Sequence, residues 1–239
     1  MLPFFYQEFL SDNLKEYVLD EATSKHCIQV LRMEVGDAII LTNGKGLRCE
    51  AEIKTPSKKH TVVNIKSNKF LEKPLPEFSL AIAFTKNKTR NEWLLEKITE
   101  MGISHIYPII SQRSERDKVN FERLNGILVA AMLQSQQAYL PVLHLSKKLK
   151  EFMVEMEAFK GQKFIAHCVE AAERKDLLQA LEKNKDTLVL VGPEGDFSEE
   201  EIELCLQKEF KSVSFGKNRL RTETAGLYAC TLFNAINNE

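Results

Sequence analysis

The sequence lacks the features that mark secreted, membrane-bound or disulfide-rich proteins. Its five cysteines are far apart and never form a C-x-x-C pair, which argues against a zinc ribbon, a redox pair or a disulfide framework. The N-terminus has neither the basic region nor the small-residue cleavage site of a signal peptide. The longest uncharged stretch, residues 124–146, contains Gln134, Gln136 and Gln137 and cannot span a bilayer. We therefore expect a cytoplasmic protein with no membrane partner.

Several common catalytic motifs are also missing. There is no G-x-x-x-x-G-K-[ST] loop, no G-x-G-x-x-G after a strand, no H-E-x-x-H and no G-x-S-x-G. Kinases, dinucleotide-dependent dehydrogenases, metalloproteases and serine hydrolases therefore do not fit. The five histidines, at positions 26, 60, 105, 144 and 167, have no metal-ligand spacing, so we expect no metal.

The charge is balanced overall but not locally. The 33 Lys and Arg residues face 34 Asp and Glu residues, for a formal net charge of −1. Residues 54–73 nevertheless contain six lysines and one acid, and two further basic segments lie at 85–90 and 211–221. Each segment is consistent with solvated surface, whereas a shared face would favour a nucleic-acid partner.

Residues 1–72 have the pattern of a small β-domain. Short strands are predicted at 38–42, 47–53 and 60–65, with a hairpin turn at 43–46 and a short helix near 24–30. Short strands joined by tight turns favour a small barrel. The stretch K-P-L-P at 73–76 is stiff and extended, so we place the domain boundary at this point.

Residues 73–239 alternate between strand and helix patterns. Strands are predicted at 78–84, 105–110, 163–168, 187–191 and 212–215, and helices at 91–101, 121–138, 173–184, 199–208 and 223–237. The strand at 187–191 is continuously apolar, as in a sheet covered on both faces. The second domain is therefore predicted to be α/β with a mainly parallel sheet.

Two strand-to-helix loops could carry chemistry. In the first, V-G-P-E-G-D-F-S at 191–198, a capping box joins Ser198 to Glu201 and a hydrophobic staple joins Phe197 to Ile202. A well-made turn explains these four residues but not the glycines and proline before them. Glycines at the carboxyl end of a parallel strand also let a ligand approach the backbone, so both interpretations stay open.

The second loop, residues 215–225, has the same order of strand, glycine-containing loop and helix. Thr222 could cap the helix, and Arg221 with Glu223 could form a surface ion pair worth only about 0–1 kcal/mol. An arginine and a glutamate beside two glycine loops also make a pocket plausible.

Both loops contain sequence motifs that are similar to those of a known family. The motifs Gly192-Pro193-Glu194-Gly195 and Leu220-Arg221-Thr222-Glu223-Thr224-Ala225 resemble those of the RsmE family, the ribosomal RNA small-subunit methyltransferases E of the SPOUT class. Further matches follow in the family's order along nearly the whole chain: His26, Arg32, Gly36, Asp37, Lys97, Glu100, Gly102, Pro108, Arg113, Ser114, Gln134, Ser135 and Pro141. Asp196 and Gln137 depart from the pattern, because the family usually has glycine and often has arginine at these two positions.

The resemblance implies an S-adenosylmethionine-dependent enzyme that methylates uridine N3 in 16S rRNA, as free RNA or in the small ribosomal subunit. It also implies a PUA-like β-barrel at 1–72, a methyltransferase domain with a deep trefoil knot at 73–239, and a homodimer. The expected cofactor-binding residues are Val191, Gly192, Pro193, Glu194, Gly195, Phe215, Gly216, Leu220, Arg221, Thr222, Thr224 and Ala225.

Catalytic and RNA-binding roles can also be assigned to particular residues. We expect Arg221 to polarise a uracil carbonyl, and Glu223 to act either as general base or as support for a neighbouring group. The expected RNA-binding residues are Arg32, Lys58, Lys59, Lys86, Lys88, Arg90 and Arg113. Two alternatives stay open: a SPOUT-type methyltransferase with another RNA target, and a non-catalytic RNA-binding assembly factor.

Overall fold

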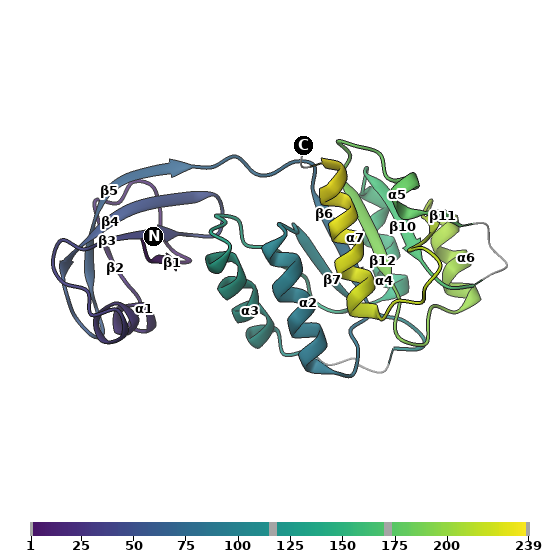
Figure 1. Ribbon diagram of the computed structural model, residues 1–239, viewed down its shortest axis with the longest axis horizontal. Coiled ribbons are helices and arrows are strands. Elements are labelled where there is room, and N and C mark those ends of the chain that lie inside the picture. The colour runs from purple at the N-terminus through teal and green to yellow at the C-terminus, as the bar shows by residue number, and fades with distance from the viewer. Residues whose placement is uncertain (1, 115–118, 170–173, 238–239) are drawn as a thin grey trace. The chain divides into compact units, whose positions relative to one another are not determined.

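The computed structural model describes residues 2–114, 119–169 and 174–237 (Figure 1). The chain divides into two compact units. Unit 1 comprises residues 1–73 and 132–140, and unit 2 comprises residues 74–131 and 141–239. Across the described residues, no helix is long and apolar enough to cross a membrane.

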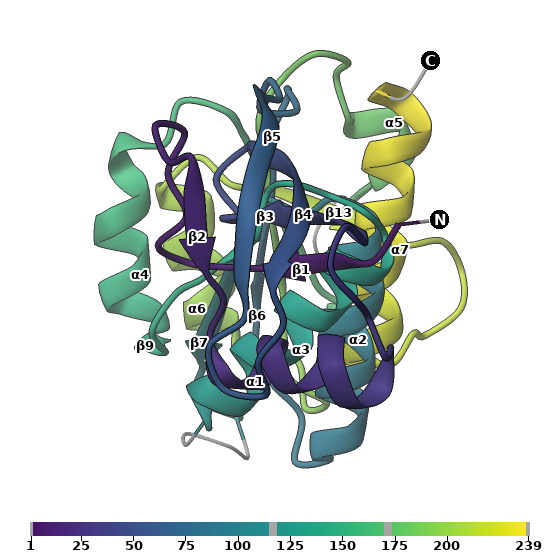
Figure 2. The same cartoon turned by 90° about the vertical axis from the view of Figure 1, so that its left-hand side faces the viewer.

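Unit 1 contains one five-stranded sheet. Its strands, in spatial order, are β1 (Phe4–Tyr6), β3 (Ala38–Thr42), β4 (Leu47–Thr55), β5 (Val62–Phe70) and β2 (Glu16–Val18). β1 pairs with β3 in parallel and the other pairs are antiparallel. Figure 2 shows β5 between β4 and β2. The predicted hairpin turn at 43–46 is confirmed, and Gly44 and Gly46 take the positive φ angles of 69° and 94° that the turn requires.

The core of unit 1 follows from the alternation of β4. Leu47, Cys49, Ala51 and Ile53 are buried while the residues between them are not, so one face of the strand packs against the apolar interior. The predicted helix near 24–30 is confirmed as α1 (Glu21–Lys25) followed by a π-helical turn (His26–Val30). Asp20 caps α1 by accepting a hydrogen bond from the backbone of Thr23 at 2.8 Å.

Unit 2 is built on a parallel sheet, as predicted. Its neighbouring strands are β11 (Lys175–Asp176), β13 (Lys211–Ser214), β10 (Gln162–Ala166), β12 (Thr187–Val191), β6 (Phe78–Ile82), β7 (His105–Ile110) and β8 (Val142–Leu143). A further strand, β9 (Lys147–Lys148), also pairs with β7, and every pairing is parallel. All five residues of β6 and of β12 are buried, because helices cover both faces of the sheet.

Alternate residues of β6 face different helices. Ala81 belongs to the apolar cluster that includes residues of α4 (Leu149–Glu155) and α6 (Glu199–Gln207). Leu80 and Ile82 instead contact Gly226 of α7 (Thr222–Asn237), which lies beside α2 (Lys88–Glu100) in Figure 1. The sheet is therefore the middle of three layers. The remaining helices are α3 (Phe121–Gln134), α5 (Leu177–Ala180) and a 3₁₀ turn (Met156–Ala158).

The predicted helix at 173–184 is wrong over most of its length. β11 takes up its start, and α5 ends at Ala180; residue 173 itself lies outside the described residues. The cause is the buried side chain of Gln162, which accepts from the Glu182 amide and donates to the Glu182 carbonyl, both at 3.0 Å. These two bonds offer the backbone at 182 an alternative to helical pairing.

Candidate active site

The two loops singled out in the sequence line one cavity of about 500 Å³ in unit 2. The cavity lies at the carboxyl ends of the neighbouring strands β10, β12 and β13, which is where parallel α/β sheets bind ligands. Its lining residues are Arg90, Ala166, His167, Cys168, Arg174, Val191, Gly192, Pro193, Glu194, Asp196, Val213, Ser214, Phe215, Gly216, Asn218, Arg219, Leu220, Arg221, Thr222 and Ala225.

The first loop, residues 191–197, is shaped by the aromatic ring of Phe197. This ring is buried, and it would lie 3.1 Å from a Cβ atom placed on Gly192, so a larger residue at 192 would push the ring away. The capping box at the start of α6 is confirmed, with Ser198 and Glu201 bonding each other's backbone amides at 3.0 and 3.3 Å. A turn-forming role and a cavity-lining role therefore coexist in this loop.

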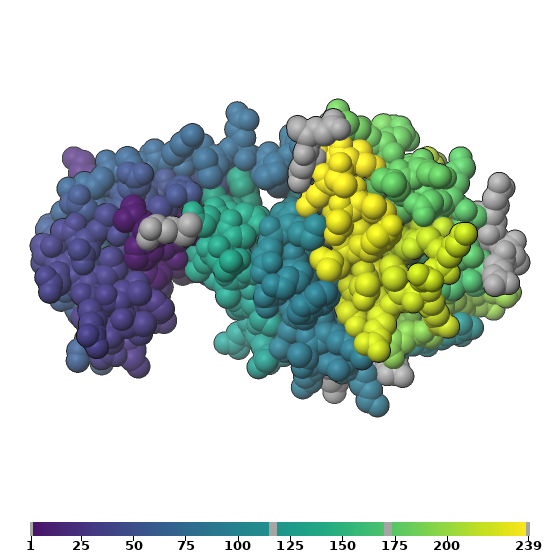
Figure 3. Space-filling model, viewed as in Figure 1, coloured from purple at the N-terminus to yellow at the C-terminus, as the bar shows by residue number. Residues whose placement is uncertain are grey.

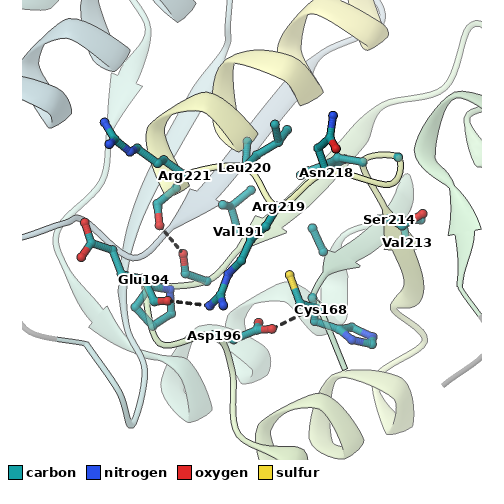
Figure 4. A pocket seen from close by; sticks show the side chains of 18 of the residues that line it. Cys168, Val191, Glu194, Asp196, Val213, Ser214, Asn218, Arg219, Leu220 and Arg221 are labelled. Atoms are coloured by element: carbon teal, nitrogen blue, oxygen red, sulfur yellow. Dashed lines mark hydrogen bonds between the residues drawn. The ribbon is translucent and has the colours of Figure 1, made fainter. Parts of the chain in front are cut away.

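Side chains from other loops hold the carbonyl groups of residues 192–195. Thr222 Oγ1 donates to the Gly192 carbonyl at 3.1 Å. Arg219 Nη2 donates to the Glu194 carbonyl, also at 3.1 Å (Figure 4). Arg113 Nη1 donates to the Gly195 carbonyl at 2.9 Å. The second loop and residue 113 thus fix the path of the first loop.

The end of β10 forms another part of the cavity lining. His167 is buried, and its Nε2 lies 2.9 Å from Ser212 Oγ. Burial is the main cause that lowers the pKa of His167, with Arg174 acting in the same direction and Asp196 opposing it. Asp196 Oδ2 accepts a hydrogen bond from the Cys168 amide at 2.7 Å, as Figure 4 shows. This bond joins the first loop to the segment that follows β10.

Glu223 lies beside the cavity but does not line it. Its side chain is 8% exposed, and its Oε1 lies 3.5 Å from Arg90 Nε. The Nη1 atom of the same arginine lies 3.5 Å from Glu194 Oε1, while Glu223 Oε2 is buried with no hydrogen-bond partner among the described atoms. Arg90 therefore connects a buried carboxylate to one on the cavity wall.

The structure brings most of the predicted cofactor residues together, whereas the predicted RNA residues are divided between the two units. Of the predicted cofactor set, only Gly195 and Thr224 do not line the cavity. Arg90 lines it, and Arg113 packs against Gly195, although both were expected to bind RNA. Lys86 and Lys88 are exposed in unit 2, and the exposed residues Arg32, Lys58 and Lys59 belong to unit 1.

Several cavity residues were not among the site residues predicted from the sequence. Arg174, Asp196 and Arg219 are the charged members of this set, and the others are Ala166, His167, Cys168, Val213, Ser214 and Asn218. The strand order is the missing information, because β10 pairs with both β12 and β13. Among the described residues, no group of three or more His, Cys, Asp or Glu side chains could hold a metal ion.

Comparison with known proteins identifies the family. The RNA methyltransferase domain family matches residues 71–234, more than half of the chain, and the RNA methyltransferase PUA domain matches residues 19–66. The ribosomal RNA small subunit methyltransferase E of Rickettsia conorii is 28% identical over 92% of this chain and 91% of its own length. The chain belongs to the RsmE family. The predicted combination of a PUA-like domain and an α/β methyltransferase domain is thereby confirmed.

Solved structures agree with this membership of the RsmE family. A probable rRNA-methyltransferase from Porphyromonas gingivalis superimposes with a TM-score of 0.91, with 36% identity and 99% of each chain covered. A methyltransferase from Legionella pneumophila, solved with bound SAM, has a TM-score of 0.86 and 28% identity, covering 99% of this chain and 98% of its own. The Neisseria gonorrhoeae RsmE bound to S-adenosyl methionine has a TM-score of 0.85 and 26% identity, with the same coverage.

Proposed function

We propose that this protein is an S-adenosylmethionine-dependent rRNA methyltransferase that methylates N3 of a specific uridine in 16S rRNA. The observation that carries the proposal is the cavity at the ends of β10, β12 and β13, which is lined by both motif loops of an RsmE-family chain. Relatives named as ribosomal RNA small subunit methyltransferases support the rRNA substrate.

The residues of the cavity suit S-adenosylmethionine. A volume of about 500 Å³ lies within the usual range for sites of small ligands and cofactors, roughly 300–1,000 Å³. Val191, Leu220 and Ala225 give it an apolar surface, Glu194 supplies a carboxylate, and four arginines supply guanidinium groups. Apolar surface suits the adenine ring, a carboxylate suits the sulfonium and ammonium groups of the cofactor, and a guanidinium suits its carboxylate.

The bound cofactor supplies an electrophilic methyl group, so the chain has to orient the uracil and favour loss of its N3 proton. Arg221 lines the cavity from the start of α7, and we assign it to polarise a uracil carbonyl and stabilise the developing anion. Positioning of the base contributes further to the rate. Because N3 is buried within a base pair, the target uridine has to be unpaired or extruded.

For Glu223, the contacts support a positioning role more than that of general base. The carboxylate is buried beside Arg90 and does not line the cavity. A buried carboxylate can hold a guanidinium in a fixed geometry. We therefore assign Glu223 to hold Arg90, which in turn contacts Glu194 on the cofactor loop.

We assign RNA binding to exposed basic residues of both units: Arg32, Lys58, Lys59, Lys86 and Lys88. Contacts with phosphate predict that affinity falls steeply with salt. Reversing the charge of Lys58 and Lys59 should weaken RNA binding and flatten that salt dependence. A matched double reversal of the exposed Lys148 and Lys150 is the control, and equal effects of the two pairs would refute the assignment.

We also propose that the protein acts in the cytoplasm as a homodimer. Trp93 on α2 is 43% exposed and Tyr228 on α7 is 36% exposed, and these two helices form one surface of unit 2 (Figure 3). Exposed aromatic residues favour a protein contact. Light scattering at micromolar concentration tests the homodimer, and the mass of a monomer would contradict it. The domain boundary at residues 72–73 and the trefoil knot stay predictions.

The test of the proposed function is methylation in vitro. Purified protein is incubated with S-adenosylmethionine and undermethylated small ribosomal subunits, free 16S rRNA or unrelated RNA, and the digested RNA is analysed by nucleoside mass spectrometry. We expect 3-methyluridine in 16S rRNA, whether free or within the small subunit, and none in the unrelated RNA. A methylated nucleoside only in the unrelated RNA would favour another target, and failure to bind the cofactor would favour the RNA-binding assembly factor.

A further inference from the structure

We propose that Asp196 is a positioning residue that locks the cofactor loop, residues 191–197, onto the end of β10. The inference rests on the proposed function, in that the cavity is taken to hold S-adenosylmethionine. Asp196 lines this cavity, yet both of its carboxylate oxygens accept hydrogen bonds from backbone amides. Its contacts are therefore those of a structural clamp within the site.

The topology explains why a clamp is needed. β10 and β12 are parallel neighbours, and Ala166 at the end of one strand is paired with Val191 at the end of the other. Beyond these residues the ladder stops, and both segments continue as part of the cavity lining. Asp196 Oδ2 spans the gap by accepting from the Cys168 amide at 2.7 Å (Figure 4). This bond continues the connection between the strands where the sheet no longer provides it.

The backbone at Asp196 indicates that the side chain stabilises an unfavourable conformation. Its φ angle is +64°, in the left-handed region that residues other than glycine rarely adopt. Oδ1 accepts from the adjacent Phe197 amide at 2.8 Å, and the Asp196 amide donates to the Pro193 carbonyl at 2.9 Å. Glycine would relieve the strain but would lose both carboxylate bonds.

The clamp also reaches the glycine motif through Phe197. The Phe197 ring is buried against Gly192, 3.1 Å from where a Cβ atom would stand. Release of the Phe197 amide would let the ring and Gly192 shift together, and Gly192 lines the cavity. Asp196 therefore holds the cavity in the shape that binds the cofactor, which reduces the ordering cost of binding.

The test compares cofactor affinity in Asp196→Gly, Asp196→Asn and the unchanged protein by calorimetry. S-adenosylmethionine and S-adenosylhomocysteine are both titrated, because only the first carries the sulfonium charge. We expect Asp196→Gly to weaken both ligands by the same factor, about ten-fold. Asn tolerates a positive φ and keeps one acceptor oxygen, so it should restore part of the affinity.

The control is Asp176→Gly, which removes a carboxylate bond to the Leu178 amide outside the cavity lining and should leave affinity unchanged. Deuterium exchange in free Asp196→Gly should increase at the Cys168 amide. Unchanged affinity in Asp196→Gly would overturn the clamp. A loss much larger for S-adenosylmethionine than for S-adenosylhomocysteine would replace it with direct contact to the sulfonium. Failure of the unchanged protein to bind either ligand would instead refute the proposed function.

Discussion

Arginines hold the site together at the scale of single residues. Arg113 and Arg219 donate to the carbonyls of Gly195 and Glu194, and Arg90 pairs with two carboxylates. Their planar guanidinium groups suit such contacts, so lysine would be a poor replacement. Arg221 differs because it lines the cavity and its side chain has no hydrogen-bond or ion-pair partner among the described residues.

Replacing Arg221 by Ala should therefore affect the chemical step more than cofactor binding. We expect methylation of small subunits to fall by about 10²-fold or more, on the scale of losing one group that stabilises a developing anion. Calorimetry should give a dissociation constant for S-adenosylmethionine within a few-fold of the unchanged protein. Full activity in this variant would remove Arg221 from the mechanism.

The pair of Arg90 and Glu223 predicts a coupling in stability. Arg90→Ala leaves the buried Glu223 carboxylate without its cation, and we expect urea unfolding to show a loss of about 1–2 kcal/mol, below the value for a fully buried pair because Arg90 is one-third exposed. Glu223→Gln in the same chain should recover part of that loss. Additive effects of the two substitutions would show that the contact is not energetically coupled.

The residues of the loops were predictable, whereas the contacts between the loops were not. The motifs at 191–198 and 220–225 contain nine of the twenty residues that line the cavity. Cys168 and Asp196 are 28 positions apart, and only the pairing of β10 with β12 brings them together. Arg90 looked like the neighbouring lysines of its basic segment, because charge alone does not reveal which cation faces a buried acid.

At the scale of elements, α7 and the sheet approach closely at one glycine. A Cβ atom on Gly226 would lie 3.1–3.3 Å from Leu80, Ile82 and Leu94, so the small residue allows the helix to pack on β6 and α2. Gly126 in α3 has nothing within 4 Å of the same position. Replacing these two helical glycines by larger residues should therefore have opposite effects on stability.

Gly126→Ala should raise the free energy of unfolding by about 0.5–1 kcal/mol, because alanine is the better helix former and meets no neighbour. Gly226→Val should lower it by about 1–3 kcal/mol through overpacking. Urea unfolding of both variants checks these signs. Stabilisation by Gly226→Val would mean that α7 packs less tightly on the sheet than described.

Element types followed from sequence patterns, except where a single buried side chain intervened. The continuously apolar strand at 187–191 and the amphipathic pattern at 199–208 appear where expected, as β12 and α6. The segment 173–184 has a helical pattern, but Gln162 binds the backbone of Glu182 and ends α5 early. Such a contact from another strand has no local signature.

At the scale of the whole molecule, the half-buried His144 and the buried His167 link stability to pH. The pKa of His144 is lowered chiefly by burial, then by His105, with Lys147 in the same direction and Glu155 opposing. Burial likewise lowers the pKa of His167. In mildly acidic solution the folded state therefore binds fewer protons than the unfolded state. The contribution of the two histidines to the free energy of unfolding is present above their unfolded pKa of about 6.5, and it is lost as the pH falls through their folded-state pKa values.

The free energy of unfolding in urea should thus decline when the pH is lowered below about 6.5. His144→Gln should reduce the decline, whereas the same change at the exposed His60 should not alter it. An unchanged slope in His144→Gln would contradict a neutral, half-buried imidazole at that position.

The proposed reaction transfers a methyl group to uridine N3 of 16S rRNA. The most direct measurement uses S-adenosylmethionine with a deuterated methyl group and undermethylated small subunits, followed by nucleoside mass spectrometry against synthetic standards. We predict labelled 3-methyluridine with the unchanged protein and a level lower by about 10²-fold with Arg221→Ala. A labelled nucleoside methylated at another atom, or no label in 16S rRNA despite cofactor binding, would contradict the account.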